Sequence, residues 1–189
     1  MADLIQKEKS GDQHKSPVGE MADLFSPREI WRILKIHSYF ILTLMIGSVG
    51  MLRRLLEELK AFVRRTTRDG RRLGTIPWVR RALADLEMRV EVGRRIGLLN
   101  AWLIDQGTVP TKEGSISKIY VTELNAHVAS AGLEILGLAG QLAPTDPAAP
   151  LHGRLQWLYT IAPMQRFGGG TNEIQRIIIA DRGLGLPRK

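Results

Sequence analysis

The sequence FGGGTNEIQR at residues 167–176 joins three consecutive glycines to an apolar helical segment at residues 174–180. Glycine lets a backbone approach a ligand closely and adopts positive φ without steric cost. Thr171 or Asn172 stands where a helix N-cap belongs, with a side-chain oxygen available to a backbone N–H of the first turn. The remaining N–H groups of that turn favour an anion or a polar ring edge. The stretch predicts a backbone cradle for a ligand at a helix start, although a simple turn before a helix has the same pattern.

The composition is that of a globular domain with an ordinary core. The chain has 189 residues, of which 44% are apolar and 24% are charged. It contains no cysteine, which excludes disulfide scaffolds, thiol nucleophiles and cysteine-ligated zinc, and fits a reducing compartment. We therefore expect a cytoplasmic location. Its four histidines show no metal-ligand spacing; they are His14, His37, His127 and His152.

The formal net charge of +8 comes mostly from arginines, several of them in pairs. Such pairs are compatible with binding to nucleic acid or to an anionic surface, and this remains the alternative function. Few aromatic residues are interleaved with them, which weighs against a stacking platform for single strands. Solvated faces or contacts to an acidic partner are the preferred interpretation, and no nucleic acid is expected. The pairs are Arg53-Arg54, Arg64-Arg65, Arg71-Arg72, Arg80-Arg81 and Arg94-Arg95.

The beginning of the chain predicts a flexible tail at residues 1–25, followed by one folded domain at residues 26–189. The tail lacks the apolar region of a signal peptide. Ser26, Pro27 and Glu29 form a good helix start. The apolar run at residues 39–52 is bounded by basic residues and is shorter than the roughly 20 apolar residues of a membrane span. We interpret it as part of a buried bundle helix, and no membrane span is expected.

Helical periodicity continues through the rest of the chain. A second helix shows a stripe of Val79, Leu83, Leu86, Val90 and Gly93. Pro163 is expected to end the fourth helix. The pattern predicts an all-α fold, an antiparallel four-helix bundle plus a short C-terminal helix. The expected helices cover residues 27–63, 77–106, 115–138, 151–160 and 172–181, and the stripe of the third consists of Ile116, Tyr120, Leu124, Val128, Ala131, Ile135 and Leu138.

The terminal segment FGGGTNEIQRIIIADRGLGLPR resembles the C-terminal signature of the acyl-CoA dehydrogenase family, flavin enzymes that desaturate acyl-CoA thioesters. The resemblance extends over residues 47–188. It is clearest in LADLEM at residues 83–88, SKIY at residues 117–120 and LEILG at residues 133–137. In the family these pieces belong to a C-terminal helical bundle that packs against an N-terminal helical domain and a middle β-domain. The resemblance implies that this chain is the bundle domain alone.

The resemblance also implies part of an FAD site. Gly170, Thr171, Asn172 and Glu173 stand where the family touches FAD, and Gln175 lies one turn further along. Two other family contacts to the flavin are altered here. Glu134 and Leu138 replace a glutamine and a glycine that reach the FAD of a neighbouring subunit, and Thr66, Asp69 and Gly70 stand at an Arg-x-x-Phe-Gly segment.

No catalytic residue can be assigned. In the family a carboxylate takes the α-proton of the substrate while FAD accepts a hydride from the β-carbon. Most members carry this base just before the Gly-Thr of the signature, where this chain has Gly169. Other members carry it on the first bundle helix, near Phe40, and no Asp or Glu occurs between Glu29 and Glu57.

The main hypothesis is that the domain contributes part of an FAD site and an oligomer interface, and is inactive alone. Its expected partner is itself or a full-length acyl-CoA dehydrogenase subunit, and acyl-CoA would bind only in the completed complex. The alternative is a basic interaction module for nucleic acid or an anionic surface. A third hypothesis is an active oxidoreductase whose missing domains come from another chain, with Glu29, Glu57 or Glu58 as the base.

Overall fold

The computed structural model describes the backbone of residues 27–187 and the side chains of residues 44–187. The expected flexible tail and the Ser26 cap lie outside the described residues. The chain divides into two units, Met1–His37 and Ser38–Lys189. In the first, the described residues are the opening turns of one helix; the second contains the bundle.

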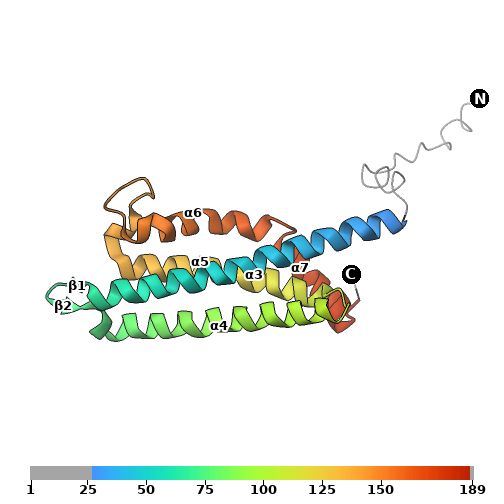
Figure 1. The fold of residues 1–189 in the computed structure, drawn as a ribbon, viewed down its shortest axis with the longest axis horizontal. Coiled ribbons are helices and arrows are strands. Elements are labelled where there is room, and N and C mark those ends of the chain that lie inside the picture. Colours follow the sequence, from blue (N-terminus) through green and yellow to red (C-terminus); the bar gives the residue numbers. More distant parts are fainter. Residues whose placement is uncertain (1–26, 188–189) are drawn as a thin grey trace, which may run out of the picture. The chain divides into compact units, whose positions relative to one another are not determined.

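The predicted all-α class is confirmed (Figure 1). Pro27 and Pro77 both occupy the first position of a helix, where the missing N–H costs no hydrogen bond. Thr111, six residues after the second helix ends, begins the third. The α-helices are α3 (Pro27–Arg65), α4 (Pro77–Asp105), α5 (Thr111–Leu136), α6 (Arg154–Phe167) and the short α7 (Asn172–Ile178). The last of these continues into a π-helical turn at Ile179–Gly183.

The core of the Ser38–Lys189 unit is built around α5. This helix packs against α4, α6 and α7, and it lies between α4 and α6 in Figure 1. The predicted α4 stripe is confirmed, since Leu83 is half-buried and its other members are buried. Full burial of one leucine side chain contributes roughly 1.5–3 kcal/mol. The buried leucines of α3 are Leu52, Leu55, Leu56 and Leu59.

The buried surface of α5 is wider than its predicted apolar stripe. Leu124, Val128 and Ile135 are buried as expected, but Ile116 is 40% exposed and Leu138 is 93% exposed. Because α5 contacts several helices, much of its circumference is covered. Polar residues outside the stripe are therefore buried as well; they include Ser117, Lys118, Thr122 and Asn125.

The prediction that Pro163 ends the fourth helix is wrong, because α6 continues through it to Phe167. Proline removes one backbone hydrogen bond from a helix interior. Contacts to α5 hold the last turn in place beyond it. Asn125 Nδ2 donates to Gln165 Oε1 at 2.7 Å, and Lys118 Nζ donates to the Arg166 carbonyl at 2.8 Å.

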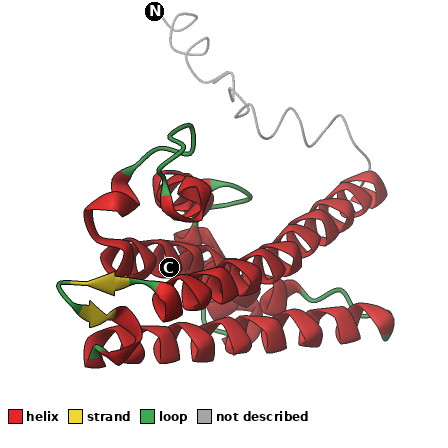
Figure 2. Ribbon diagram, turned by 60° about the vertical axis from the view of Figure 1, so that its left-hand side comes forward, coloured by secondary structure: helices red, strands yellow, loops and turns green. Residues whose placement is uncertain are grey.

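The connection between α3 and α4 is a small antiparallel hairpin, β1 (Thr67–Arg68) and β2 (Arg71–Arg72), followed by a 3₁₀ turn at Leu73–Thr75 (Figure 2). Asp69 and Gly70 have φ of 52° and 73°, as a tight hairpin turn requires. Arg68 Nη2 donates to the Ile135 and Leu136 carbonyls at 2.8 and 2.9 Å. The hairpin is thereby fastened to the C-terminal end of α5.

Short 3₁₀ segments at Gly137–Gln141 and Pro150–Gly153 flank the loop between α5 and α6. Among the residues that the structure describes, no helix is long and apolar enough to cross a membrane.

Candidate functional site

The three glycines form the loop between α6 and α7, which we call the glycine loop (residues 168–170). Gly169 and Gly170 have φ of 70° and 92°, a region that L side chains rarely adopt. A Cβ on Gly170 would lie 2.9 Å from Gln175 Nε2. The backbone conformation therefore requires glycine at position 170, whereas the Gln175 side chain could move away from an added Cβ.

Thr171 is the N-cap of α7, which settles which of the two candidate residues caps it. The backbone N–H of Ile174 donates to Thr171 Oγ1 at 3.3 Å. The carboxylate of Glu173 accepts hydrogen bonds from its own backbone N–H and from the Thr171 hydroxyl, and these lower its pKa, with a further contribution from Arg176. Glu173 is thus a surface carboxylate held at the start of α7.

Asn172 turns its side chain inward, away from the surface of the glycine loop. Only 3% of Asn172 is exposed. Its Oδ1 accepts from Lys118 Nζ at 2.7 Å and lies 3.2 Å from Thr122 Oγ1. Gln175 folds back so that its Nε2 donates to the Gly169 carbonyl at 3.2 Å.

The structure therefore brings all five predicted cofactor residues together but gives them different orientations. Gly170 and Glu173 are exposed, whereas Thr171 and Gln175 are half-buried. Asn172 is buried, and its amide faces α5 and not the surface. Contact of these residues with FAD stays a prediction.

Lys118 belongs to this site and was not among the predicted site residues; the sequence analysis used it only as part of the SKIY segment at residues 117–120. It is 1% exposed, and burial lowers its pKa, an effect opposed by the charge of Glu173. Lys118, Thr122 and Asn125 follow one another at steps of four and three, which places them on one helix face. That spacing was a signal of a polar face, but it did not indicate that the face is buried.

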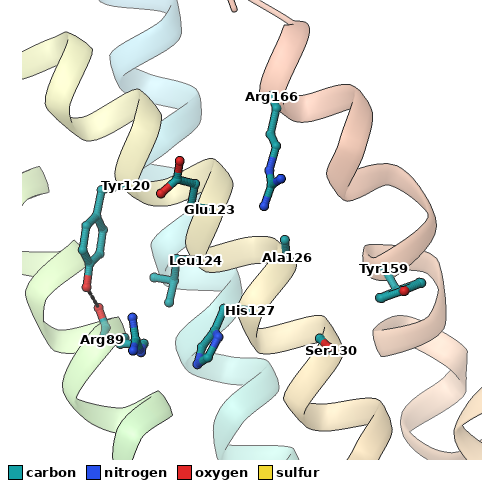
Figure 3. Close-up of a pocket in the computed structure, with 9 residues that line it drawn as sticks. All are labelled: Arg89, Tyr120, Glu123, Leu124, Ala126, His127, Ser130, Tyr159 and Arg166. Carbon is teal, nitrogen blue, oxygen red and sulfur yellow. Dashed lines mark hydrogen bonds between the residues drawn. The ribbon is translucent and has the colours of Figure 1, made fainter. Parts of the chain in front are cut away.

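A separate groove lies between α4, α5 and α6 (Figure 3). Its volume is about 480 Å³, and Arg89, His127 and Arg166 are among its lining residues. His127 Nε2 lies 2.8 Å from Asp85 Oδ2, and hydrogen bonds from Arg89 and then His127 lower the pKa of Asp85. A lowered carboxyl pKa suits an ion pair better than a proton-abstracting base.

The glutamates proposed as alternative bases are engaged in ion pairs on the helix surface. Glu57 pairs with Lys60 at 2.8 Å, and this contact lowers its pKa. Glu58 pairs with Arg54 at 3.4 Å and with Arg154. The side chain of Glu29 lies outside the described residues. The position expected for the usual base is Gly169, in the glycine loop.

Comparison with known proteins identifies the family. The profile of the acyl-CoA dehydrogenase C-terminal domain matches residues 42–184. The acyl-CoA dehydrogenase FadE26 of Mycobacterium tuberculosis is 36% identical over 125 residues, which cover 63% of this chain and 30% of that protein. L-prolyl-[peptidyl-carrier protein] dehydrogenase of Serratia sp. is 30% identical over 138 residues, which cover 73% of this chain and 33% of that protein.

Solved structures agree. The steroid acyl-CoA dehydrogenase Tcur3481-Tcur3483 has a TM-score of 0.71 and 31% identity, covering 77% of this chain and 36% of that chain. The ChsE4-ChsE5 complex of Mycobacterium tuberculosis has a TM-score of 0.68 and 32% identity, covering 76% of this chain and 37% of that chain.

This chain spans about a third of the length of the curated relatives that it matches. Neither the fold nor these relatives support the alternative of a basic module for nucleic acid or an anionic surface. The chain belongs to the acyl-CoA dehydrogenase family, and residues 42–184 form the C-terminal domain of that family.

Proposed function

We propose that this domain supplies part of an FAD-binding surface and an oligomer interface to a flavin-dependent dehydrogenase of acyl-CoA thioesters, and that it is inactive alone. The observation that carries the proposal is the glycine loop, with Gly169 and Gly170 at positive φ and Thr171 capping α7 directly after them. The members of the family that this chain resembles place their flavin against the same signature.

The residues present fit one edge of such a cofactor. Gly170 offers an exposed backbone without a side chain, and Glu173 and Gln175 flank it. The negative charge of Glu173 favours the N–H or hydroxyl donors of a ligand and repels the phosphate groups of the ligand. When bound, FAD supplies the hydride acceptor, which no protein side chain can provide. The role of this chain would be to bind and orient one side of the flavin.

The site is incomplete without further protein. The usual position of the base is Gly169, and the glutamates with described side chains that we considered as substitutes are ion-paired. We propose that a second copy or a longer family member completes the site. One structural relative is itself a complex of two proteins, ChsE4 and ChsE5.

The outer face of α4 is the proposed oligomer interface. Met88, Val92, Leu99 and Trp102 repeat at steps of four, seven and three, which places them on one face. They are 63%, 45%, 48% and 58% exposed. An apolar stripe of this kind marks an interaction surface.

Size-exclusion chromatography with light scattering tests the interface. The purified chain should form an oligomer, and Trp102→Asp should shift it towards the monomer. Trp157→Asp is the matched control, because Trp157 is 48% exposed on α6. A stable monomer of the unaltered chain at high concentration, with no association with a full-length family member, would remove the interface from the proposal.

The absorption spectrum tests the flavin site. The chain, dialysed after incubation with excess FAD, should retain flavin bands between about 350 and 500 nm, because a protein-bound flavin keeps its absorption. A colourless chain, whether alone or mixed with a full-length family member, would contradict the FAD part of the proposal.

A further inference from the structure

Lys118 connects the two sides of the glycine loop through a single buried ammonium group. Its Nζ donates to the carbonyl of Arg166, near the end of α6, at 2.8 Å. The same Nζ donates to Oδ1 of Asn172, the first residue of α7, at 2.7 Å. One atom of α5 therefore fixes the chain immediately before and immediately after the loop.

Neighbouring residues of α5 strengthen the second attachment. Thr122 Oγ1 lies 3.2 Å from Asn172 Oδ1, and its single proton is shared with the nearer Lys118 carbonyl at 2.9 Å. Asn172 Nδ2 lies 3.5 Å from Glu123 Oε1, which accepts from Arg176 Nη2 at 2.6 Å. The start of α7 is thus held by side chains of α5 through directional contacts.

The glycine loop needs such external support. Glycine loses more conformational freedom on folding than any other residue, and ordering the backbone costs roughly 1–2 kcal/mol per residue. The loop contributes the Gly168 N–H bond to the Met164 carbonyl and the bond from Gln175 Nε2 to the Gly169 carbonyl. Contacts from α5 on both sides offset the remaining cost of ordering it.

Burial of a lysine at this position costs free energy that an apolar residue of similar size would not cost. Burying a charge costs more than burying an apolar side chain of similar size, unless the charge is well satisfied by hydrogen bonds. The two acceptors of Lys118 are neutral oxygens, and both belong to the ends of the loop. The hydrogen bonds of the ammonium group therefore fix the positions of the residues on the two sides of the loop.

We infer that Lys118 is a positioning residue that sets the conformation of the glycine loop by joining the end of α6 to the first residue of α7. The ligand-binding consequence rests on the proposed function, because the loop would then hold FAD in a fixed geometry. The structural part of the inference stands without any ligand.

Hydrogen exchange followed by mass spectrometry tests the structural part. In Lys118→Met, the hydrogen-bonded amides of Gly168, Ile174 and Gln175 should exchange about tenfold faster or more, because the loop opens locally. Peptides from α4 should exchange at the unaltered rate. Lys112→Met is the matched control, since the Lys112 side chain is 49% exposed on the same helix, and it should change neither region.

Variants of Asn172 keep the test decisive if Lys118→Met does not fold. Asn172→Leu, which removes the Oδ1 acceptor of the ammonium group, should accelerate loop exchange as Lys118→Met does. The effect of the double variant of Lys118→Met and Asn172→Leu should be smaller than the sum of the two single effects, since both remove the contact between Lys118 Nζ and Asn172 Oδ1. Unchanged loop exchange in Lys118→Met or, where that variant does not fold, in Asn172→Leu would overturn the inference. Equal acceleration in all peptides would do so too.

Titration of FAD into the same variants tests the functional part. Lys118→Met should weaken FAD binding about tenfold or more, with its α4 peptides still protected, and Lys112→Met should leave it unchanged. If the unaltered chain and its mixtures with full-length members bind no FAD, the proposed function fails, while the exchange experiment still decides the role of Lys118. If FAD binds equally to Lys118→Met and the unaltered chain, the positioning role towards the ligand is wrong.

Discussion

The bundle core and the glycine loop are stabilised by different forces within the same unit. The core consists mainly of leucine, valine and isoleucine side chains contributed by α3, α4, α5 and α6. The region of the glycine loop and α7 is held by polar contacts with α5, in which Lys118 donates and Glu123 accepts hydrogen bonds. Apolar packing is spread over many contacts, so the loss of one side chain lowers the stability of the whole unit. Directional polar contacts are few, so each of them is more specific and more easily lost locally.

The largest expected effect is in the core. Leu56 is 1% exposed, and Leu56→Ala should lower the free energy of unfolding by about 2–5 kcal/mol, because it removes buried methyl groups and leaves a cavity. Urea titration followed by circular dichroism measures this. Met51→Ala is the control, since Met51 is 43% exposed on the same helix. Equal losses in the two variants would mean that this part of α3 does not contribute to the core as described.

A smaller effect is expected where the buried polar contact is broken. Asn172→Leu removes one of the two acceptors of Lys118 and should cost about 1–3 kcal/mol, the usual penalty for a buried group left without its partner. Urea titration gives the total loss. A loss below that of Met51→Ala would show that the polar contacts do not stabilise this region.

Loss of the α7 cap should have a smaller effect still. Thr171→Ala removes the acceptor of the Ile174 N–H and should destabilise the start of α7 by about 0.5–2 kcal/mol. Hydrogen exchange of the Ile174 amide reports on it directly. Thr160→Ala is the control, because Thr160 is an exposed residue within α6 whose hydroxyl donates to the Gln156 carbonyl. Faster exchange confined to residues 171–176 is expected; no change at Ile174 would contradict the cap.

The smallest expected effect is electrostatic and lies on the surface of the bundle. Hydrogen bonds from Arg94, and the charges of Arg94 and Arg95, lower the pKa of Glu91 from 4.5 to about 2. Because the folded-state pKa is depressed, this stabilisation is present above pH 4.5 and is lost as the pH falls towards 2. Glu91→Gln should therefore show a weaker decline of melting temperature between these pH values. An identical decline in both proteins would show that the ion pair makes no measurable contribution to stability, which is the case for many exposed pairs.

Most of the core residues and the position of the glycine loop could be predicted from the sequence. Pro77 and the stripe from Val79 to Gly93 fixed α4, because helix periodicity is a local property. Pro163 was misread, since contacts of Asn125 and Lys118 with residues 165 and 166 keep the helix intact beyond it. The burial of Lys118 could not be predicted either. Its partner Asn172 is 54 residues away, and only the packing of α5 against α6 and α7 brings the two together.

The most direct test of the central claim is an FAD titration of the purified chain beside its Gly170→Val variant. Gly170 has φ of 92°, and a Cβ there would displace the Gln175 side chain, so valine would distort the glycine loop. Gly107→Val is the control, because Gly107 has φ of 73° but no atom within 4 Å of the added Cβ. Our account predicts saturable FAD binding by the unaltered chain and by the Gly107 variant, and its loss in Gly170→Val. Equal FAD binding by all three proteins, or binding by none of them even when mixed with a full-length family member, would contradict it.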